Sequence, residues 1–404
     1  MRIFTEAEAI QYTKDQKFFA LDAELICKNI QEEADSEGMI NLVYRIYDLF
    51  TGKSVIFKQS MPRMLAVVQQ KGAEYAPEMP LDRLSTEIKM LTFLRSIDAD
   101  IVPEVYLVDY ERGISLMEDL SHLDLMRFTM KDGVTYPAFG TRIGTVLAQL
   151  HFLTSHYALC DADREKLMDY FGSSAWDRVD DFFLERCPLA TPYIQMENSC
   201  DALRARTMAT PKIQSLLKHL SEVFRSRVCL VHNDVHTSNV LIDQNEIKLI
   251  DSELAGFSAP YVDLGRLSGS FITNYIANLY RTDQPLETRA KMQAYDVQML
   301  SDIFNAYKLT LQKLGAAYDV QEDLTPFYTE IVRDTLLYAT GWTMIKVASD
   351  VYLSPDAACV TDPQTIAAMQ LKASELAEDV WMHIESYSVV EDFIATLADY
   401  FQIV

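Results

Sequence analysis

The first 120 residues combine short apolar runs of the kind found in strands with two helical patterns. Apolar residues recur at helical spacing in residues 1–18 and again in 81–94, and they predict amphipathic helices there. Residues 41–59 contain two runs rich in β-branched and aromatic residues on either side of Thr51-Gly52, which predicts a β-hairpin. Residues 102–120 predict two further strands. The first part of the chain is therefore expected to be rich in strands.

After residue 120 the pattern becomes helical. Amphipathic segments predict helices at 138–157, 212–226, 263–280, 287–315 and 324–350. Residues 228–251 are an exception, because a short apolar run is followed there by a polar loop and a predicted small hairpin. The whole pattern predicts an α+β fold in two lobes, a small strand-rich N-lobe over residues 1–120 and a larger, mainly helical C-lobe over residues 121–404.

Composition and charge narrow the classes of partner. The chain has 404 residues, 49% hydrophobic and 24% charged, as is usual for globular proteins. Its formal net charge is −23, because 59 acidic residues face 36 basic ones. A surface of this sign repels phosphate backbones and anionic lipid, so we expect neither a nucleic-acid nor a membrane partner. An acidic surface is compatible with a small-molecule substrate that is cationic, or with an anionic one whose charge is neutralised by a divalent metal.

The cysteines and the N-terminal residues indicate a compartment. The six cysteines are scattered, and none has the spacing of a zinc site. Such residues are typical of free thiols in a reducing cytoplasm. The N-terminal segment is charged and lacks the apolar stretch of a signal peptide, and no apolar run approaches the roughly 18 residues of a membrane span. We therefore expect a cytoplasmic protein.

The polar loop after Val231 contains the candidate catalytic and metal-binding residues. It has the sequence HNDVHTSN over residues 232–239, and Asp251-Ser252-Glu253 follows the predicted hairpin. Because the hairpin returns the chain to its start, these two clusters can converge. Carboxylate and amide oxygens suit Mg²⁺, and phosphoryl transfer needs a carboxylate at the acceptor hydroxyl together with metal-binding groups. Single Asp or Asn residues are common turn formers, but the ordered set favours a site.

This spacing resembles the signature of protein-kinase-like phosphotransferases, and most closely that of the methylthioribose kinases, relatives of the aminoglycoside and choline kinases. That family has HGDLHTGS followed by D-x-E. Further similar stretches are GKSVIFKQSMP at 52–62, LMEDLSH at 116–122, LAQLHFLTS at 147–155 and YVDLG at 261–265. The resemblance covers about residues 41–346. It implies a bilobal protein-kinase-like fold and an ATP- and Mg²⁺-dependent kinase of methionine salvage.

The resemblance also implies roles for residues of the two polar clusters. Asp234 would be the catalytic base, braced by His232. Asp251 and Glu253 would hold divalent metal, with Asn239 as a further ligand. Asp263, in the YVDLG segment, would have a structural role and accept hydrogen bonds from loop amides.

For the nucleotide, the resemblance implies residues of the N-lobe. Lys58 would pair with the α- and β-phosphates, and Glu87 would position Lys58. Asn41 ends the turn 36–41, which is expected to contact the phosphates. The backbone of Glu118, Asp119 and Leu120 would meet the adenine.

The sequence departs from the family pattern at three places. The glycine-rich phosphate loop is nearly absent, with Gly38 alone in residues 32–41, and Asn233 replaces a glycine beside Asp234. The family's late twin arginine, which helps to bind the sugar, is replaced by Lys346-Val347. Lys346 is therefore expected on the acceptor side, and Arg266 or Arg63 would supply a compensating cation.

The remaining alternatives concern the acceptor and the class of protein. His236 is placed with the acceptor-binding residues, although a local hydrogen-bonding role is the simpler interpretation. The leading acceptor is C1 of 5-methylthioribose, and an amino-alcohol, an aminoglycoside or another pentose is the alternative. A nucleotide-binding pseudokinase is the alternative of another class. The oligomeric state stays open, with a homodimer among the alternatives.

Overall fold

The computed structural model describes residues 3–30, 40–65, 68, 72, 76, 78–172, 209–348 and 354–400. Its N-terminal part is a five-stranded antiparallel sheet in the order β1-β2-β3-β5-β4. The strands are β1 (Leu25–Asn29), β2 (Leu42–Asp48), β3 (Ser54–Gln59), β4 (Val105–Asp109) and β5 (Ile114–Met117). Helix α1 (Glu6–Asp15) packs against β1 and β2, and begins with a capping box formed by Thr5 and Glu8.

The β2–β3 hairpin follows directly from its sequence. Alternate residues of β2 are buried, as expected for a strand with one face on a core. The turn that joins β2 to β3 contains Gly52 with φ of 70°, a conformation that glycine adopts without steric cost. The hairpin matters for function because it places Lys58 on the buried end of β3.

Two hydrophobic clusters form the core. The smaller one joins α1 to the sheet. The larger one fills the helical part and also includes Met90, Leu91 and Leu94 from helix α3 (Arg83–Ile97). Helix α3 therefore packs with the helical part, although it precedes Leu120 in sequence. The lobe boundary expected near residue 120 stays a prediction.

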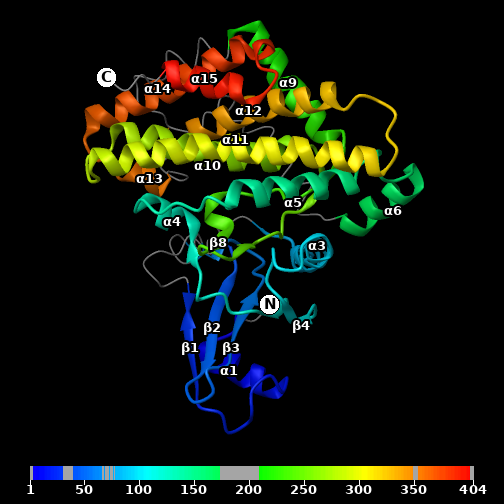
Figure 1. Cartoon of the computed structure of the whole chain (residues 1–404). Coiled ribbons are helices and arrows are strands. Elements are labelled where there is room, and N and C mark those ends of the chain that lie inside the picture. The colour runs from blue at the N-terminus through cyan, green and yellow to red at the C-terminus, as the bar shows by residue number, and fades with distance from the viewer. Residues whose placement is uncertain are drawn as a thin grey trace.

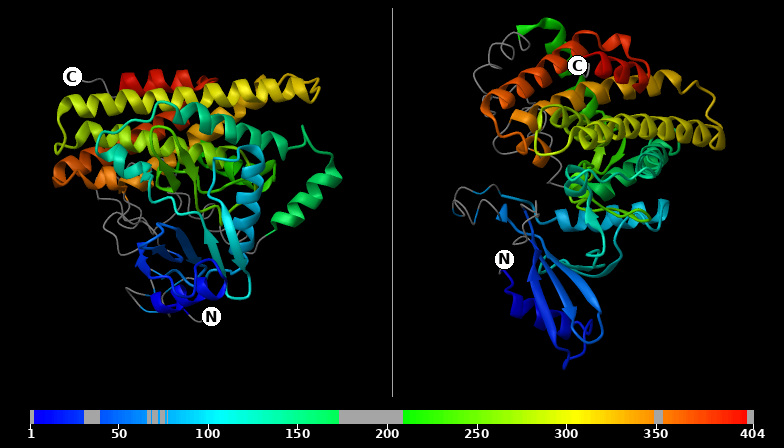
Figure 2. Two further views of the ribbon diagram at one scale, coloured as in Figure 1. Left: turned by 60° about the horizontal axis from the view of Figure 1, so that its bottom comes forward. Right: turned by 60° about the vertical axis from the view of Figure 1, so that its left-hand side comes forward.

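The helical part is built around a buried central helix. Nearly every residue of α10 (Tyr261–Tyr280) is buried, and its neighbours are α11 (Leu286–Ala317) and α12 (Thr325–Ala348). Figures 1 and 2 show these long helices stacked on one side of the molecule and the N-terminal sheet on the other. The other helices described are α4 (Met126–Lys131), α5 (Phe139–Leu153), α6 (Asp161–Phe171), α9 (Pro211–Arg225), α13 (Pro355–Ala358), α14 (Pro363–Met382) and α15 (Val390–Tyr400).

A group of short strands lies between the sheet and the helices. The strands β8 (Val240–Ile242) and β9 (Ile247–Leu249) form the predicted hairpin, and β6 (Asp124–Leu125) pairs with β8. Strand β7 (Cys229–Val231) pairs with β10 (Gly256–Ser258). The polar loop between β7 and β8 includes the short 3-10 helix η2 (Thr237–Asn239). These pairings bring the loop and the Asp251–Glu253 segment to one place.

The expected fold class, an α+β protein with a strand-rich N-terminal part and a mainly helical remainder, is confirmed by this element order. Within the described ranges, no helix is long and apolar enough to cross a bilayer.

Candidate active site

The loop that follows β7 is fixed by Asp263, the third residue of α10. Its carboxylate accepts hydrogen bonds from the backbone N–H groups of His232 (2.9 Å) and Asn233 (2.7 Å). The ring of His151 on α5 lies 3.2 Å from the same carboxylate and 3.0 Å from the hydroxyl of Tyr307. All five side chains are buried. The loop is therefore anchored from two helices, α5 and α10.

Two residues of the site have left-handed backbone conformations. Asn233 has φ of 68° and Asp251 has φ of 63°. Asn and Asp are the residues other than glycine that adopt this region most readily. The side chain of Asn233 also donates to the carbonyl of Leu254 at 3.0 Å. Asn233 thus keeps a turn that glycine would make, and it adds a bond to the segment after Asp251.

Asp234 is surrounded by donors. Nδ2 of Asn239 donates to its Oδ2 at 2.9 Å, and Nε2 of His236 lies 3.4 Å from its Oδ1. The guanidinium of Arg266, on α10, pairs with Oδ1. Burial alone would raise the pKa of Asp234, but the charges of His236 and Arg266 outweigh it and bring the pKa well below its ordinary value. Asp234 is therefore an ionised carboxylate with a fixed orientation.

Arg266 belongs to a group of cations and aromatic rings on the other side of Asp234. Its guanidinium lies 5.1 Å from the ring centre of Trp342, and its Nε is 3.3 Å from the hydroxyl of Tyr338. Nζ of Lys346 lies 5.0 Å from the same Trp342 ring. Both are cation–π distances. Lys346, at the position of the expected sugar-binding cation, is thereby linked to Asp234 through Trp342 and Arg266.

The approach of α12 to α10 depends on two glycines. A Cβ atom on Gly265 would lie 2.6 Å from the ring of Tyr338, and one on Gly269 would lie 2.7 Å from the ring of Trp342. Both distances are shorter than side chains tolerate. The two glycines therefore leave room for the rings of Tyr338 and Trp342, and both of these residues of α12 contact Arg266 of α10.

Lys58 connects the N-terminal sheet to the segment after β9. Its Nζ lies 2.6 Å from Oε1 of Glu87 and 2.7 Å from Oδ1 of Asp251. Burial alone would lower the pKa of Lys58, but the carboxylates of Asp251, Glu87 and Glu253 outweigh it and raise the pKa. Burial raises the pKa of Glu87, and the charge of Lys58 opposes that shift. The expected pairing of Lys58 with Glu87 on α3 is present in the geometry.

Glu253 is held by α3 and β2. Nη1 of Arg83 lies 2.5 Å from Oε1 of Glu253, and Nδ2 of Asn41 donates to Oε2 at 2.7 Å. The Glu253 side chain is only 2% exposed. Nη2 of Arg83 donates to Oδ1 of Asn41 at 3.2 Å as well. Asn41, expected at the nucleotide phosphates, thus has its side chain against Glu253 in this arrangement, and its contact with phosphate stays a prediction.

The segment expected at the adenine has some of its groups already engaged. The N–H of Glu118 donates to the carbonyl of Glu104 at 2.8 Å, and the Asp119 carboxylate pairs with Arg45 at 2.7 Å. The carbonyl of Leu120 accepts from the N–H of Leu123 at 2.9 Å. A base bound here would therefore use other backbone groups, such as the carbonyl of Glu118 and the N–H of Leu120.

The donor set fits a divalent cation shared with substrate phosphates. The Asp251 side chain is 36% exposed, so its carboxylate is accessible. Since Nδ2 of Asn239 donates to Asp234, its amide oxygen is the atom that would face a cation. Mg²⁺ usually takes one or two carboxylates plus phosphate oxygens and water. Among the described residues, no group of three or more His, Cys, Asp or Glu side chains could hold a metal alone. Oε1 of Glu253 pairs with Arg83 and Oε2 accepts from Asn41, so Glu253 would support the site through these contacts.

Two other expectations have different outcomes. Arg63 pairs with Glu78 at 2.9 Å and donates to the carbonyl of Ala76, so its guanidinium is directed to the connection before α3. Of the two candidate compensating cations, Arg266 is the one that contacts Asp234. The phosphate-loop residues around Gly38 lie outside the described residues.

Neither Arg83 nor the aromatic residues Tyr338 and Trp342 were singled out from the sequence. A usable signal was present in both cases. Tyr338, Trp342 and Lys346 follow one another at intervals of four on a predicted helix, and so share one face. Arg83 and Glu87 are also four residues apart, on the helix expected to position Lys58.

The chain is similar to several known proteins. A model described as a phosphotransferase enzyme family matches residues 32–301. Methylthioribose kinase of Bacillus mycoides is 29% identical over 350 residues, covering 85% of this chain and 83% of that protein. Methylthioribose kinase of Bacillus velezensis is 28% identical over 288 residues, covering 70% and 69%. An ethanolamine kinase of Plasmodium vivax aligns in structure with a TM-score of 0.48 and 13% identity, over 93% of this chain and 90% of that one.

The family model spans more than half of the chain and includes the loop at 232–239 and the Asp251–Glu253 segment. The match to this family also confirms the expected protein-kinase-like fold class. The chain belongs to the phosphotransferase enzyme family.

Proposed function

We propose that the protein transfers the γ-phosphoryl group of ATP to a hydroxyl group of a small sugar, and that 5-methylthioribose, phosphorylated at C1 in methionine salvage, is the leading acceptor. The observation that carries this proposal is the contact of Lys58 with Asp251, next to the loop that contains Asp234. The N–H of Ile250 donates to the carbonyl of Asn239, whose side chain donates to Asp234. The names of its relatives, from two Bacillus species, support the choice of sugar.

In this mechanism Asp234 receives the acceptor. A carboxylate has about four lone-pair positions, so an acceptor hydroxyl can join Asn239, His236 and Arg266 around it. Asp234 orients the hydroxyl oxygen toward the γ-phosphorus and takes its proton as the new O–P bond forms and ADP leaves. Arg266 keeps the carboxylate ionised, since it lowers the pKa of Asp234.

The nucleotide side is served by Lys58, Asp251 and Asn239. Lys58 is held by Glu87 and Asp251, so its ammonium group is positioned for the α- and β-phosphates. Asp251 and Asn239 would hold Mg²⁺, which when bound neutralises charge on the transferring phosphates. Glu253, held by Arg83 and Asn41, would fix the segment that contains Asp251.

A panel of acceptors tests this proposal. Purified protein with ATP and Mg²⁺ is incubated with methylthioribose, ribose, choline, ethanolamine and an aminoglycoside, and ADP release is measured. ADP release with methylthioribose far above the other acceptors is the expected result. Release with choline or an aminoglycoside alone would move the protein to another acceptor class, and nucleotide binding without release for any acceptor would indicate a pseudokinase.

A further inference from the structure

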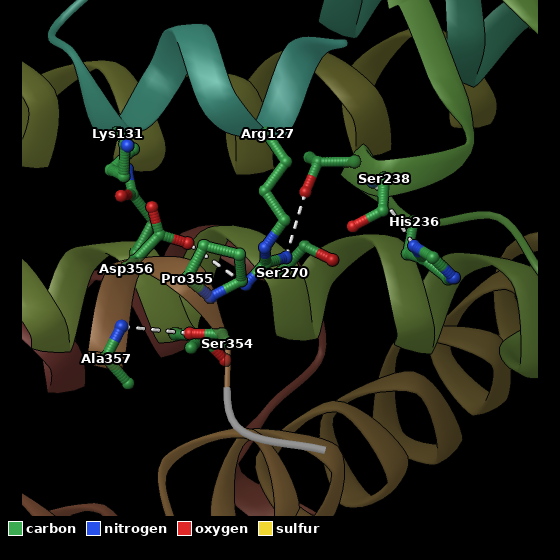
Figure 3. A network of polar contacts seen from close by, with 12 residues as sticks. Arg127, Lys131, His236, Ser238, Ser270, Ser354, Pro355, Asp356 and Ala357 are labelled. Atoms are coloured by element: carbon green, nitrogen blue, oxygen red, sulfur yellow. Dashed lines mark hydrogen bonds and ion pairs between the residues drawn. The ribbon is translucent and has the colours of Figure 1, made fainter. Parts of the chain in front are cut away.

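The catalytic loop has a second support besides Asp263. Thr237, between Asp234 and Asn239 in sequence, accepts a hydrogen bond at its Oγ1 from Nη1 of Arg127, at 3.1 Å. Both side chains are buried. Figure 3 shows Arg127 extending from α4 toward the loop segment that contains His236 and Ser238. Arg127 therefore contacts the loop although it is 110 residues away from Thr237 in sequence, so the loop motif does not include it.

The same guanidinium pairs with a residue of α13. Nη2 of Arg127 lies 3.0 Å from Oδ2 of Asp356, and each side chain is 3% exposed. In Figure 3 the guanidinium lies between the loop and α13, with Asp356 on the α13 side. Arg127 thus bridges the catalytic loop to a helix more than a hundred residues later in the chain.

Helix α13 is in turn attached to the end of α12. The N–H of Ser354 donates to the carbonyl of Lys346 at 2.9 Å. The side chain of Ser354 caps α13 by accepting from the N–H of Ala357 at 3.0 Å. Asp356 is therefore placed relative to Lys346, the cation expected to meet the acceptor.

Two routes thus lead from the end of α12 to the catalytic loop. One passes from Lys346 and Trp342 to Arg266 and reaches Asp234. The other passes through α13 and Arg127 and reaches the loop at Thr237. The two routes enter the loop three residues apart.

A purely structural role explains this pair less well. A buried ion pair is often no more stabilising than apolar side chains of similar volume. What a planar guanidinium does provide is a fixed relative orientation of two partners. Here it donates a hydrogen bond to Thr237 in the loop and forms an ion pair with Asp356 in α13.

We propose that Arg127 and Asp356 are positioning residues that couple the acceptor-side end of α12 to the catalytic loop and keep Asp234 in register with the acceptor hydroxyl. The kinetic part of this proposal rests on the proposed function. The mechanical part, that a change at Asp356 alters the loop, does not.

Hydrogen–deuterium exchange on the full chain tests the mechanical part. Asp356→Asn is expected to give roughly tenfold faster exchange in amides of residues 232–240, far from it in sequence. The control is Asp98→Asn, which breaks a more exposed ion pair between elements, that of Asp98 with Arg142 at 3.0 Å. Exchange that rises only in residues 354–359, or rises equally in the control, would overturn the proposal.

Kinetics test the positioning part. Arg127→Met and Asp356→Asn are each expected to lower kcat by roughly 10- to 100-fold, because small misplacements of reacting groups are costly. The Kd for ADP should change less than about twofold. The double variant Arg127→Met/Asp356→Leu should remain as slow as the single variants. Full recovery of kcat in that apolar double variant would show a merely structural pair.

Two further variants keep the test decisive. If Arg127→Met does not fold, Thr237→Val removes the loop contact and leaves the ion pair, and it should show the same loss of kcat. Normal turnover in folded Thr237→Val would contradict the proposal. If the wild-type protein transfers phosphate to no acceptor, the proposed function fails, while the exchange experiment still decides the coupling.

Discussion

Nζ of Lys58 lies 2.7 Å from Oδ1 of Asp251, although the two residues are 193 positions apart in sequence. Lys58 comes from the N-terminal sheet, and Asp251 follows a short strand of the helical part. Only a fold that brings the sheet onto this segment makes the contact. In the proposed mechanism this pair is the place where the nucleotide phosphates and their metal are received.

The two carboxylates of the Asp251–Glu253 segment should behave differently on substitution. Asp251→Ala should remove the dependence of ADP affinity on Mg²⁺, because Asp251 is the exposed carboxylate. Glu253→Gln should keep most of that dependence, since Arg83 and Asn41 occupy both its oxygens. Calorimetric titration of ADP with and without Mg²⁺ measures both. An equal loss of Mg²⁺ dependence in the two variants would show that Glu253 binds the metal directly.

Glu253→Gln should instead reduce stability. It leaves the buried charge of Arg83 uncompensated, and breaking a buried pair typically costs about 3–5 kcal/mol. Arg83→Met should have a similar effect, and the double variant should cost less than the sum. Denaturant unfolding measures these values, with Arg63→Met as the control because its ion pair is exposed. An unchanged unfolding free energy in Glu253→Gln would contradict the role given to Arg83.

Arg266 should control both rate and pH dependence. Arg266→Met removes a charge that lowers the pKa of Asp234, so that pKa should rise. Asp234 would then become protonated at higher pH, and the loss of kcat/KM on the acidic side should begin at higher pH than in the wild type. The loss of kcat at neutral pH should be on the order of 10²-fold or more. If the acidic limb of the pH profile were unchanged in Arg266→Met, Arg266 would not control the pKa of Asp234.

Asp334 on α12 predicts a pH dependence of stability that is independent of catalysis. Burial raises the pKa of its carboxyl from 3.8 to about 6, against the opposing attraction of His219. Since the folded state binds this proton more tightly, the stabilisation is complete below pH 3.8 and is lost as pH rises through about 6.

The comparison with Asp334→Asn isolates this contribution. Between those pH values, the unfolding free energy of the wild type should fall relative to the variant by at most about 3 kcal/mol. Denaturant unfolding at several pH values measures the difference, and a difference that does not vary with pH would contradict the assignment.

Local patterns predicted those elements whose signal lies within them. The hairpin β2–β3, helix α3 and the long helices α10, α11 and α12 follow from period and turn residues. Helices α6, α14 and α15 were not predicted, although α14 begins with an Asp362 cap and Pro363 at its first turn, which are ordinary start signals. Strand β1 has no clear alternation of burial, and β6 has only two residues, so neither carries a local signal.

The site shows the same division. The motif spacing predicted that the loop of Asp234 and the segment of Asp251 would converge, because the hairpin between them returns the chain to its start. The resemblance implied the pairing of Lys58 with Glu87, and Arg266 was one of two candidate cations. The partners of Glu253 and Asp356 were not predicted. The contacts of Arg83 with Glu253 and of Arg127 with Asp356 depend on how helices pack, and a local pattern contains no information about side-chain pairs between distant elements.

In the proposed mechanism Asp234 acts as the base in phosphoryl transfer from ATP to a sugar hydroxyl. ³¹P NMR of a reaction with ATP, Mg²⁺ and methylthioribose tests it most directly, with wild type, Asp234→Asn and the control Asp243→Asn, whose carboxylate accepts amide bonds in the turn between β8 and β9. We expect a sugar 1-phosphate signal at equal rates from wild type and Asp243→Asn, and a rate lower by roughly 10²-fold or more from Asp234→Asn, with ADP affinity unchanged. A sugar phosphate formed at the wild-type rate by Asp234→Asn would show that Asp234 is not the base.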